Sequence, residues 1–242
     1  MSSGSHKRSL ADLLYGLWFA ASFCGCALAA IILACCVPGA QRRRRAMRAT
    51  SSALFRLAGA APAVNGAEHL PAGPAVAVAN HASYLDGLLL TAVLPESYQF
   101  VIKREVTRVP VMHFVLRRVG AHFVDRTAST RAAADLRAIL RTAGDGASLA
   151  FFPEGTFTAE PGLRPFRSGA FVLAQRCGVP LVPITLQGTR AMLPADQWLP
   201  ARAPLTVTLH RTVLAQPDGG APEAMQRCRA AILSVLDEPD LG

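Results

Sequence analysis

An uncharged apolar run near the start of the chain restricts the folding of this sequence more than any other feature. Residues 13–37 form a run of 25 residues without one charged side chain. As a helix, this run would extend roughly 37 Å, which is enough to cross the roughly 30 Å hydrocarbon core of a bilayer. A helix of this length on a soluble protein normally keeps a polar stripe, which this run lacks. We therefore expect a membrane anchor that ends at Pro38 and Gly39.

The flanks of this run leave its arrangement open. Lys7 and Arg8 precede it and the tripeptide ALA at 27–29 resembles a cleavage site, so a cleaved signal peptide is the competing interpretation. Apolar residues continue beyond that tripeptide and an arginine block closes the run, as in a stop-transfer anchor. The arginine block favours a cytoplasmic position for its side of the membrane. Because basic residues flank both ends, a hairpin or an in-plane helix remains open.

The formal net charge of +9 is concentrated at the N-terminal end. Residues 1–60 hold eight Lys and Arg against a single acid, Asp12, whereas residues 61–242 hold 17 basic and 15 acidic residues. The second part shows no basic residues interleaved with aromatics and no zinc-finger spacing, which argues against a nucleic-acid partner. We divide the chain into a membrane anchor with a basic, amphipathic segment (1–60) and one domain (61–242). The amphipathic part, 46–60, is expected to lie either on lipid or on the surface of that domain.

The cysteines do not form a metal or disulfide pattern. Four of the six lie in the apolar run, where cysteine behaves as a small hydrophobic residue. Cys177 and Cys228 are far apart in sequence and lack metal-ligand spacing. We expect no disulfide framework and no metal site, as suits a chain that faces a reducing compartment.

Strand and helix patterns alternate along residues 61–242. Short apolar segments bounded by Gly, Pro or polar residues predict strands at 74–80, 98–105, 120–126, 147–156, 179–189 and 205–214. Helical periodicity falls between them, at 83–94, 108–119, 127–144, 166–178 and 222–238. This alternation predicts an α/β layered sandwich in which helices flank a largely parallel or mixed central sheet. Ligands of such sheets bind where strands end and loops begin.

The segment NHASYLD, at 80–86, places His81 and Asp86 just after a predicted strand. On a continuous helix, side chains five residues apart are rotated by about 140°, so these two would point apart. They meet only if His81 lies in the turn before the helix and Asp86 lies in its first turn. Ser83 as N-cap, with Asp86 at N3, would produce that geometry. The alternative interpretation is a capping box in which His81 is incidental.

A second polar segment, FFPEGTFTAEPGLRPFRSGAF, begins where another predicted strand ends. Glu154, Gly155 and Thr156 follow that strand, and Arg164 and Arg167 come shortly afterwards. A glycine allows a ligand to approach the backbone, threonine offers a hydroxyl, and arginines supply forked donors that suit a phosphate. The alternative interpretation is an ordinary turn followed by surface arginines.

Four blocks together resemble the glycerolipid acyltransferase family, whose best-known members are the 1-acyl-glycerol-3-phosphate acyltransferases. The blocks are NHASYLD (80–86), GAHFVDR (120–126), FPEGT (152–156) and VPITLQG (182–188), and their order and approximate spacing match the family. The tripeptide KRE at 103–105 is also similar to the family's KxE. The resemblance covers roughly residues 60–215, and four blocks in order are far more specific than any one of them.

The resemblance implies roles for these residues. His81 would be the general base that removes a proton from the acceptor hydroxyl, and Asp86 would orient it. The hydroxyl would then attack an acyl thioester directly, without a covalent acyl-enzyme, which fits the absence of a G-x-S-x-G motif. Lys103, Arg126 and the turn at 154–156 would hold the acceptor's glycerol phosphate. The sequence does not locate the donor to the oxyanion, for which a backbone N–H near His81 or Gly155 is a candidate.

One departure from the family concerns the acceptor. Members that form phosphatidate usually have Arg after EGT, whereas this chain has Phe157. Either Arg164 and Arg167 replace the missing charge, or the acceptor is another lysolipid, such as lyso-ornithine lipid.

The sequence therefore predicts a membrane-associated O-acyltransferase of phospholipid biosynthesis, with its catalytic domain on the cytoplasmic face. Its expected partners are a lysophospholipid acceptor, the membrane and an acyl-CoA or acyl-carrier-protein donor, without any cofactor or metal. A hydrolase and a non-catalytic lipid-binding membrane protein are the alternatives.

Overall fold

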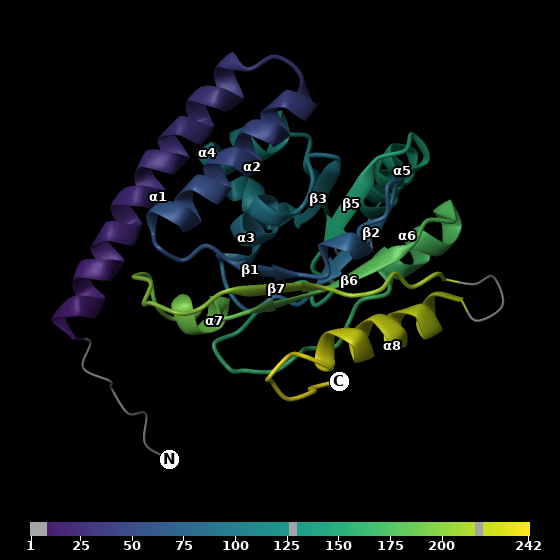
Figure 1. Ribbon diagram of the computed structural model, residues 1–242. Helices are drawn as coiled ribbons and strands as arrows, with labels where there is room; N and C mark the ends of the chain where they lie inside the picture. Colours follow the sequence, from purple (N-terminus) through teal and green to yellow (C-terminus); the bar gives the residue numbers. More distant parts are fainter. Residues whose placement is uncertain (1–8, 126–129, 216–219) are drawn as a thin grey trace.

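The computed structural model describes residues 9–125, 130–215 and 220–242 (Figure 1). Its strands are β1 (Ala63–Asn65), β2 (Val76–Ala79), β3 (Tyr98–Lys103), β4 (His122–Val124), β5 (Ser148–Phe151), β6 (Leu181–Gln187) and β7 (Thr206–Leu209). Its α-helices are α1 (Leu10–Cys36), α2 (Ala40–Leu57), α3 (Asp86–Val93), α4 (Pro110–Arg118), α5 (Thr130–Gly144), α6 (Gly169–Cys177), α7 (Thr189–Met192) and α8 (Gly220–Leu233). Two 3₁₀ turns, η1 (Ala67–His69) and η2 (Arg104–Arg108), complete the described chain.

The strands form a single seven-stranded sheet in the order β1-β7-β6-β2-β5-β3-β4. Every neighbouring pair is parallel except β6 and β7, which are antiparallel. The α/β prediction and all six predicted strands are confirmed. The sequence missed β1, because its three residues are largely exposed and carry no burial pattern. The strands β2, β5 and β3 are adjacent, so their carboxyl ends meet at one edge of the sheet.

Helices cover both faces of the sheet (Figure 1). On one face, side chains of α2 and α3 pack with strand residues; Leu54 and Phe55 of α2 lie in the same core cluster as Ala77 and Leu186. On the other face, α5, α6 and α8 pack over a second cluster that contains Val78 and Leu149. Residues of α2, from the segment we considered amphipathic, are therefore core residues of the folded body.

Helix α8 ends at Leu233, five residues before its predicted limit, and α6 and α3 each begin three residues later than predicted. The difference that concerns the site is the start of α3. This helix begins at Asp86, so the prediction of Ser83 as its N-cap is wrong. Only half of the capping box forms, because the Asp86 carboxylate accepts the Ser83 N–H while the Ser83 hydroxyl accepts the N–H of Leu85. Residues 83–85 instead make a turn that carries the chain from β2 into α3. The short helix α7 was not predicted at all.

The apolar run forms α1, which is long and apolar enough to cross a membrane by length and composition. Ser9 and Asp12 make a reciprocal capping box at its start. The helix runs alongside α2 as a hairpin (Figure 1), and one hydrogen bond in each of its halves joins it to α2 or to α4. The Trp18 indole donates to the Leu57 carbonyl at 2.8 Å, and the Arg118 guanidinium donates to the Ala34 carbonyl at 2.9 Å.

Two arginines of the block after α1 make hydrogen bonds that stabilise the fold. Arg43 donates to the carbonyls of Val37 (2.7 Å) and Arg118 (3.1 Å), and Arg44 donates to those of Glu96 (2.6 Å) and Val119 (3.1 Å). Carbonyls at the end of a helix lack intrahelical partners, and guanidinium groups satisfy them here. These two arginines tie the α1–α2 hairpin to the body, whereas Arg42 is exposed.

Candidate active site

The His81 imidazole and the Asp86 carboxylate form a close pair at the carboxyl end of β2. The Nδ1 atom of His81 lies 2.8 Å from Oδ2 of Asp86. The carboxylate is fully buried, while the imidazole keeps 19% of its surface exposed. With the proton on Nδ1 in a hydrogen bond to this carboxylate, Nε2 of the neutral ring is the atom that can accept a proton. The predicted meeting of these two side chains across the turn is found in the structure.

Two backbone N–H groups fix the Asp86 carboxylate in place. Oδ2 accepts from Ala82 N at 2.6 Å and from Ser83 N at 2.8 Å. These bonds hold the carboxylate in position, where it can orient His81 and stabilise a positive charge on it. The Ser83 hydroxyl donates to the Leu193 carbonyl at 2.8 Å and so anchors the turn to the segment after α7.

Aromatic rings enclose the His81 imidazole. Phe152 stacks on it with ring centroids 4.2 Å apart and planes inclined by 18°, and Phe157 approaches at 4.5 Å with an inclination of 58°. Tyr84, which is 67% exposed, packs edge-on against Phe157. These contacts restrict ring rotation and reduce water access to His81. Sequence reasoning missed Phe152 and Tyr84 as site residues, although Phe152 belongs to FPEGT and Tyr84 to NHASYLD.

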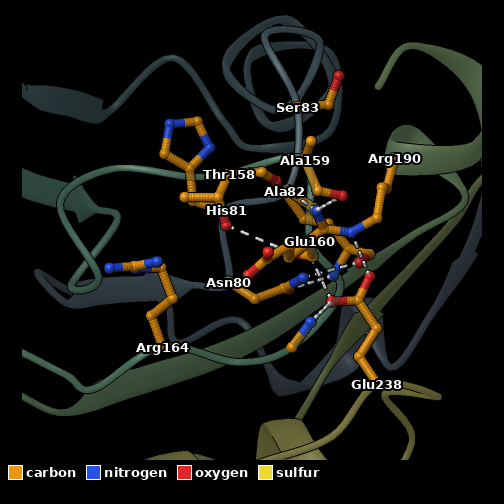
Figure 2. A network of polar contacts seen from close by, with 12 residues as sticks. Asn80, His81, Ala82, Ser83, Thr158, Ala159, Glu160, Arg164, Arg190 and Glu238 are labelled. Atoms are coloured by element: carbon orange, nitrogen blue, oxygen red, sulfur yellow. Dashed lines mark hydrogen bonds and ion pairs between the residues drawn. The ribbon is translucent and has the colours of Figure 1, made fainter. Parts of the chain in front are cut away.

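Glu154 links the histidine turn to the loop that follows β5. Its carboxylate is nearly buried and accepts the His81 N–H at 2.6 Å and the Arg164 N–H at 2.8 Å. Figure 2 shows the His81 backbone joined to this polar network while its ring points away from it. Burial raises the pKa of Glu154 to about 7, against the lowering effect of the two backbone hydrogen bonds; nearby Asp86 raises it further and Arg229 lowers it.

The remaining predicted site residues lie at the same edge of the sheet but differ in exposure. Gly155 has φ +79°, a left-handed conformation that favours glycine, and Thr156 beside it is exposed. Arg164 is half-buried, and Arg167 is exposed.

Lys103 and Arg126 are the two other predicted cations. Lys103 ends β3, keeps 42% of its side chain exposed and lies 3.5 Å from the Glu105 carboxylate. Arg126 lies outside the described residues.

The backbone donors expected for an oxyanion are engaged elsewhere. The N–H groups of His81, Ala82 and Ser83 all donate to the Glu154 or Asp86 carboxylate. The Gly155 N–H donates to the Phe152 carbonyl at 3.0 Å. In this conformation none of these four amides is open to a developing negative charge.

An apolar cavity of about 740 Å³ opens beside the histidine turn. It lies between the α1–α2 hairpin and the body, and Tyr84 and Leu85 of the turn belong to its wall. Side chains from five elements contribute to the rest of the lining, among them Phe19, Cys26, Leu54, Leu88, Phe100 and Met112. A cavity of this size and polarity suits a long hydrocarbon chain.

Within the described residues, no group of three or more His, Cys, Asp or Glu side chains could hold a metal ion. The cysteines of the body do not resemble nucleophiles either. Burial raises the pKa of Cys177 and raises that of Cys228 to about 12, which disfavours their thiolate forms.

Comparison with known proteins identifies related sequences. Residues 61–187 match the family model described as Acyltransferase. The chain is 38% identical over 133 residues to the chloroplastic 1-acyl-sn-glycerol-3-phosphate acyltransferase BAT2 of Brassica napus, over 54% of this chain and 38% of that protein. It is 32% identical over 183 residues to a 1-acyl-sn-glycerol-3-phosphate acyltransferase of Chlamydomonas reinhardtii, over 73% of this chain and 53% of that protein. The chain thus spans roughly two-fifths to half of the length of these relatives.

The fold is similar to a solved structure over nearly the whole chain. The crystal structure of the 1-acyl-sn-glycerophosphate acyltransferase PlsC from Thermotoga maritima superposes with a TM-score of 0.73. The match covers 93% of this chain and 96% of that one, at 19% sequence identity. Because it covers 93% of this chain, the match extends beyond residues 61–187 of the family model and includes most of the N-terminal helices.

Proposed function

We propose that this chain, which belongs to the acyltransferase family, transfers a fatty acyl group from a thioester to the free hydroxyl of 1-acyl-glycerol 3-phosphate, giving phosphatidate. The observation that carries this proposal is the buried Asp86 carboxylate bonded to Nδ1 of His81, beside a large apolar cavity. The names of the relatives support the acceptor.

In the proposed reaction His81 is the general base. Its Nε2 removes the proton from the acceptor hydroxyl while the hydroxyl oxygen attacks the thioester carbonyl carbon. The tetrahedral intermediate then breaks its carbon–sulfur bond, and the leaving thiolate takes the proton back from the imidazolium. Asp86 keeps the ring oriented and stabilises its charge, and a positioned base of this kind supplies roughly 10²–10⁴ in rate.

Direct transfer without a covalent acyl-enzyme is the second part of the proposal. Among the described residues, the His81 ring contacts the Asp86 carboxylate, Phe152 and Phe157, and none of these is a hydroxyl or thiol nucleophile. The nearby Ser83 in the same turn has its hydroxyl engaged, because it donates to the Leu193 carbonyl at 2.8 Å. The raised pKa values of Cys177 and Cys228 make these thiols poor candidates for an acylated intermediate. The donor is an acyl-CoA or an acyl-carrier protein, and the apolar cavity is the proposed position of an acyl chain.

We further propose that α1 lies along the membrane surface rather than across it. The contacts of Trp18 and Arg118 keep both halves of α1 on the body, whereas a perpendicular span would separate them. The outer face of the helix is apolar and exposed, with Leu14, Leu17, Leu28 and Ile32 among its residues. An anchor in one leaflet would let both lipids react without leaving the membrane, with the body on the cytoplasmic side.

The acceptor headgroup has a second candidate, because one observation favours it. Phe157 packs directly on His81. It occupies the position after EGT where family members that form phosphatidate usually have Arg. An aromatic ring there suits a less charged lysolipid, for example lyso-ornithine lipid.

The experiment is an assay of the purified protein on a panel of lysolipids with acyl-CoA and acyl-carrier-protein donors. Phosphatidate as the preferred product supports the first candidate, and preference for a zwitterionic lysolipid replaces it by the second. Thioester cleavage at equal rates with and without any acceptor would indicate a hydrolase instead.

A further inference from the structure

A largely buried ion pair lies behind the loop at residues 155–167, outside the proposed chemistry. Arg190 of α7 and Glu238 meet in two contacts, Nε to Oε1 at 2.8 Å and Nη2 to Oε2 at 3.0 Å. Their side chains are only 15% and 16% exposed. Arg190 also donates to the carbonyls of Thr158 (2.5 Å) and Ala159 (3.3 Å), and Glu238 accepts the Gly162 N–H at 2.7 Å. One ion pair therefore holds three backbone groups of the loop (Figure 2).

The backbone of the segment at 237–242 pairs with the same loop. The Leu163 N–H donates to the Pro239 carbonyl at 2.8 Å, and the Leu241 N–H donates to the Leu163 carbonyl at 3.0 Å. Gly162 has φ +137°, and a Cβ atom at this position would collide with Leu241. The loop and the segment are therefore fitted closely against each other, with the Leu163 side chain buried against Ile232.

A second arginine reinforces this pairing. Arg229 of α8 donates to the carbonyls of Leu163 (2.7 Å) and Arg164 (2.6 Å) and also pairs with Asp240. Its guanidinium lies over the Phe166 ring, 5.0 Å from the centroid. Two guanidinium–carboxylate pairs, Arg190–Glu238 and Arg229–Asp240, thus bind the loop to the segment.

These contacts continue to the catalytic histidine through Glu154. The Arg164 residue that Arg229 holds by its carbonyl donates its own N–H to Glu154, whose other oxygen accepts the His81 N–H. We propose that the segment at 237–242 is a brace for the 155–167 loop, and that Arg190 and Glu238 are positioning residues that set the acceptor site and the His81 backbone. This proposal rests on the proposed function, because it assigns the loop to the acceptor.

The first test is hydrogen exchange, which needs no activity. Glu238→Gln keeps the size of the side chain but removes its charge and places an NH₂ group against either Arg190 or the Gly162 N–H. Loss of one charged hydrogen bond should accelerate exchange of the amides at 162–164 by about 10-fold or more, with a smaller rise at His81.

A matched control is available in Glu96→Gln. Glu96 pairs with Arg45 and its side chain is 18% exposed, but it lies on the loop between α3 and β3. This variant should leave exchange at 162–164 unchanged. Unchanged exchange at 162–164 in folded Glu238→Gln would overturn the proposal, and Arg190→Lys provides an independent variant should Glu238→Gln fold poorly.

The second test is kinetic. Glu238→Gln should raise the KM for the lysolipid acceptor by about 10-fold while the donor KM stays constant. A purely structural role would lower the melting temperature without this split, and that result would also overturn the proposal. If wild-type protein acylates no lysolipid but the exchange difference is found, the proposed function is wrong, whereas the stabilisation of the 155–167 loop by the segment at 237–242 is supported.

Discussion

The turn at 80–86 and the loop at 155–167 both contribute site residues at the same edge of the sheet, but different kinds of contact hold them in place. In the turn, Asp86 receives three hydrogen bonds from residues three to five positions away, so the pair is fixed by local sequence. In the loop, the backbone is held by Arg190, Arg229 and Glu238, which are distant in sequence. The comparison teaches that the contact between His81 and Asp86 depends mainly on local geometry, whereas the conformation of the loop depends on residues that are distant in sequence.

Replacing His81 in the turn should have the largest effect on turnover of all the changes in the turn or the loop. We expect His81→Ala to lower turnover by on the order of 10²–10⁴ because it removes the proton acceptor. The fold should survive, because the ring is partly exposed and the buried Asp86 carboxylate keeps its hydrogen bonds from the N–H groups of Ala82 and Ser83. Steady-state assays beside thermal melts check this. His69→Ala is the control, because its ring bonds only the Leu209 carbonyl at 2.9 Å among its described hydrogen bonds. Near-wild-type turnover in folded His81→Ala would refute the assignment.

Asp86→Asn should damage both activity and stability. An amide cannot carry the charge that orients His81, so turnover should fall by on the order of 10². The two backbone N–H groups would lose a charged acceptor in a buried site, which should cost roughly 1.5–3 kcal/mol of unfolding free energy. Denaturant unfolding measured beside kinetics tests this. An unchanged midpoint would mean that the carboxylate does not organise the turn.

Glu154 joins the turn to the loop, and its raised pKa should make the free energy of unfolding depend on pH. Its raised folded-state pKa of about 7 means that the folded protein binds more protons than the unfolded chain between about pH 4.5 and 7. Its contribution is therefore most favourable below pH 4.5 and is lost as pH rises through 7, by roughly 3 kcal/mol. The difference in unfolding free energy between wild type and Glu154→Gln, measured from pH 5 to 8, should show this decline. A difference that is flat across this range would contradict it.

The arginines of the loop should affect the acceptor and spare the donor. We expect Arg164→Ala and Arg167→Ala to raise the acceptor KM by about 10- to 150-fold if each loses a charged contact with the phosphate. Lysine should restore only part of this, because it cannot make a bidentate contact. Arg176→Ala, an exposed arginine on α6, serves as the control. Equal effects on donor and acceptor KM would argue against a phosphate site in the loop.

Phe157→Arg should produce the smallest change. A cation restored at this partly exposed position should gain about 0.2–1 kcal/mol, or up to about 5-fold in affinity for lysophosphatidate. Parallel kinetics on a zwitterionic lysolipid should show no such gain. Tighter binding of both acceptors would indicate that removal of the aromatic ring, rather than the charge, is responsible.

The sequence predicted the parts of the molecule whose causes are local. The six predicted strands are apolar and bounded by turn residues, and the His81–Asp86 contact follows from a five-residue spacing across a turn. The family resemblance drawn from four blocks is confirmed by the match at residues 61–187. The edge strand β1 was missed because its exposed residues pair with β7 through the backbone alone.

The parts that depend on distant residues could not be predicted. Arg43 and Arg44 read as a charged flank, yet they donate to carbonyls that become available only when α4 packs beside them. Arg190 and Glu238 are 48 residues apart, and no local pattern pairs them. The buried position of Glu154 between two amides likewise requires the adjacency of β2 and β5.

The most direct test of direct acyl transfer by His81 combines intact-mass measurement with product analysis. Purified protein would be mixed with an acyl thioester, with and without lysophosphatidate, and both the protein mass and the released lipids would be recorded. The account predicts phosphatidate only when the acceptor is present, an unchanged protein mass throughout, and loss of product in His81→Ala. A protein mass increased by one acyl group in the absence of acceptor, with that group passing to lysophosphatidate when it is added, would contradict it.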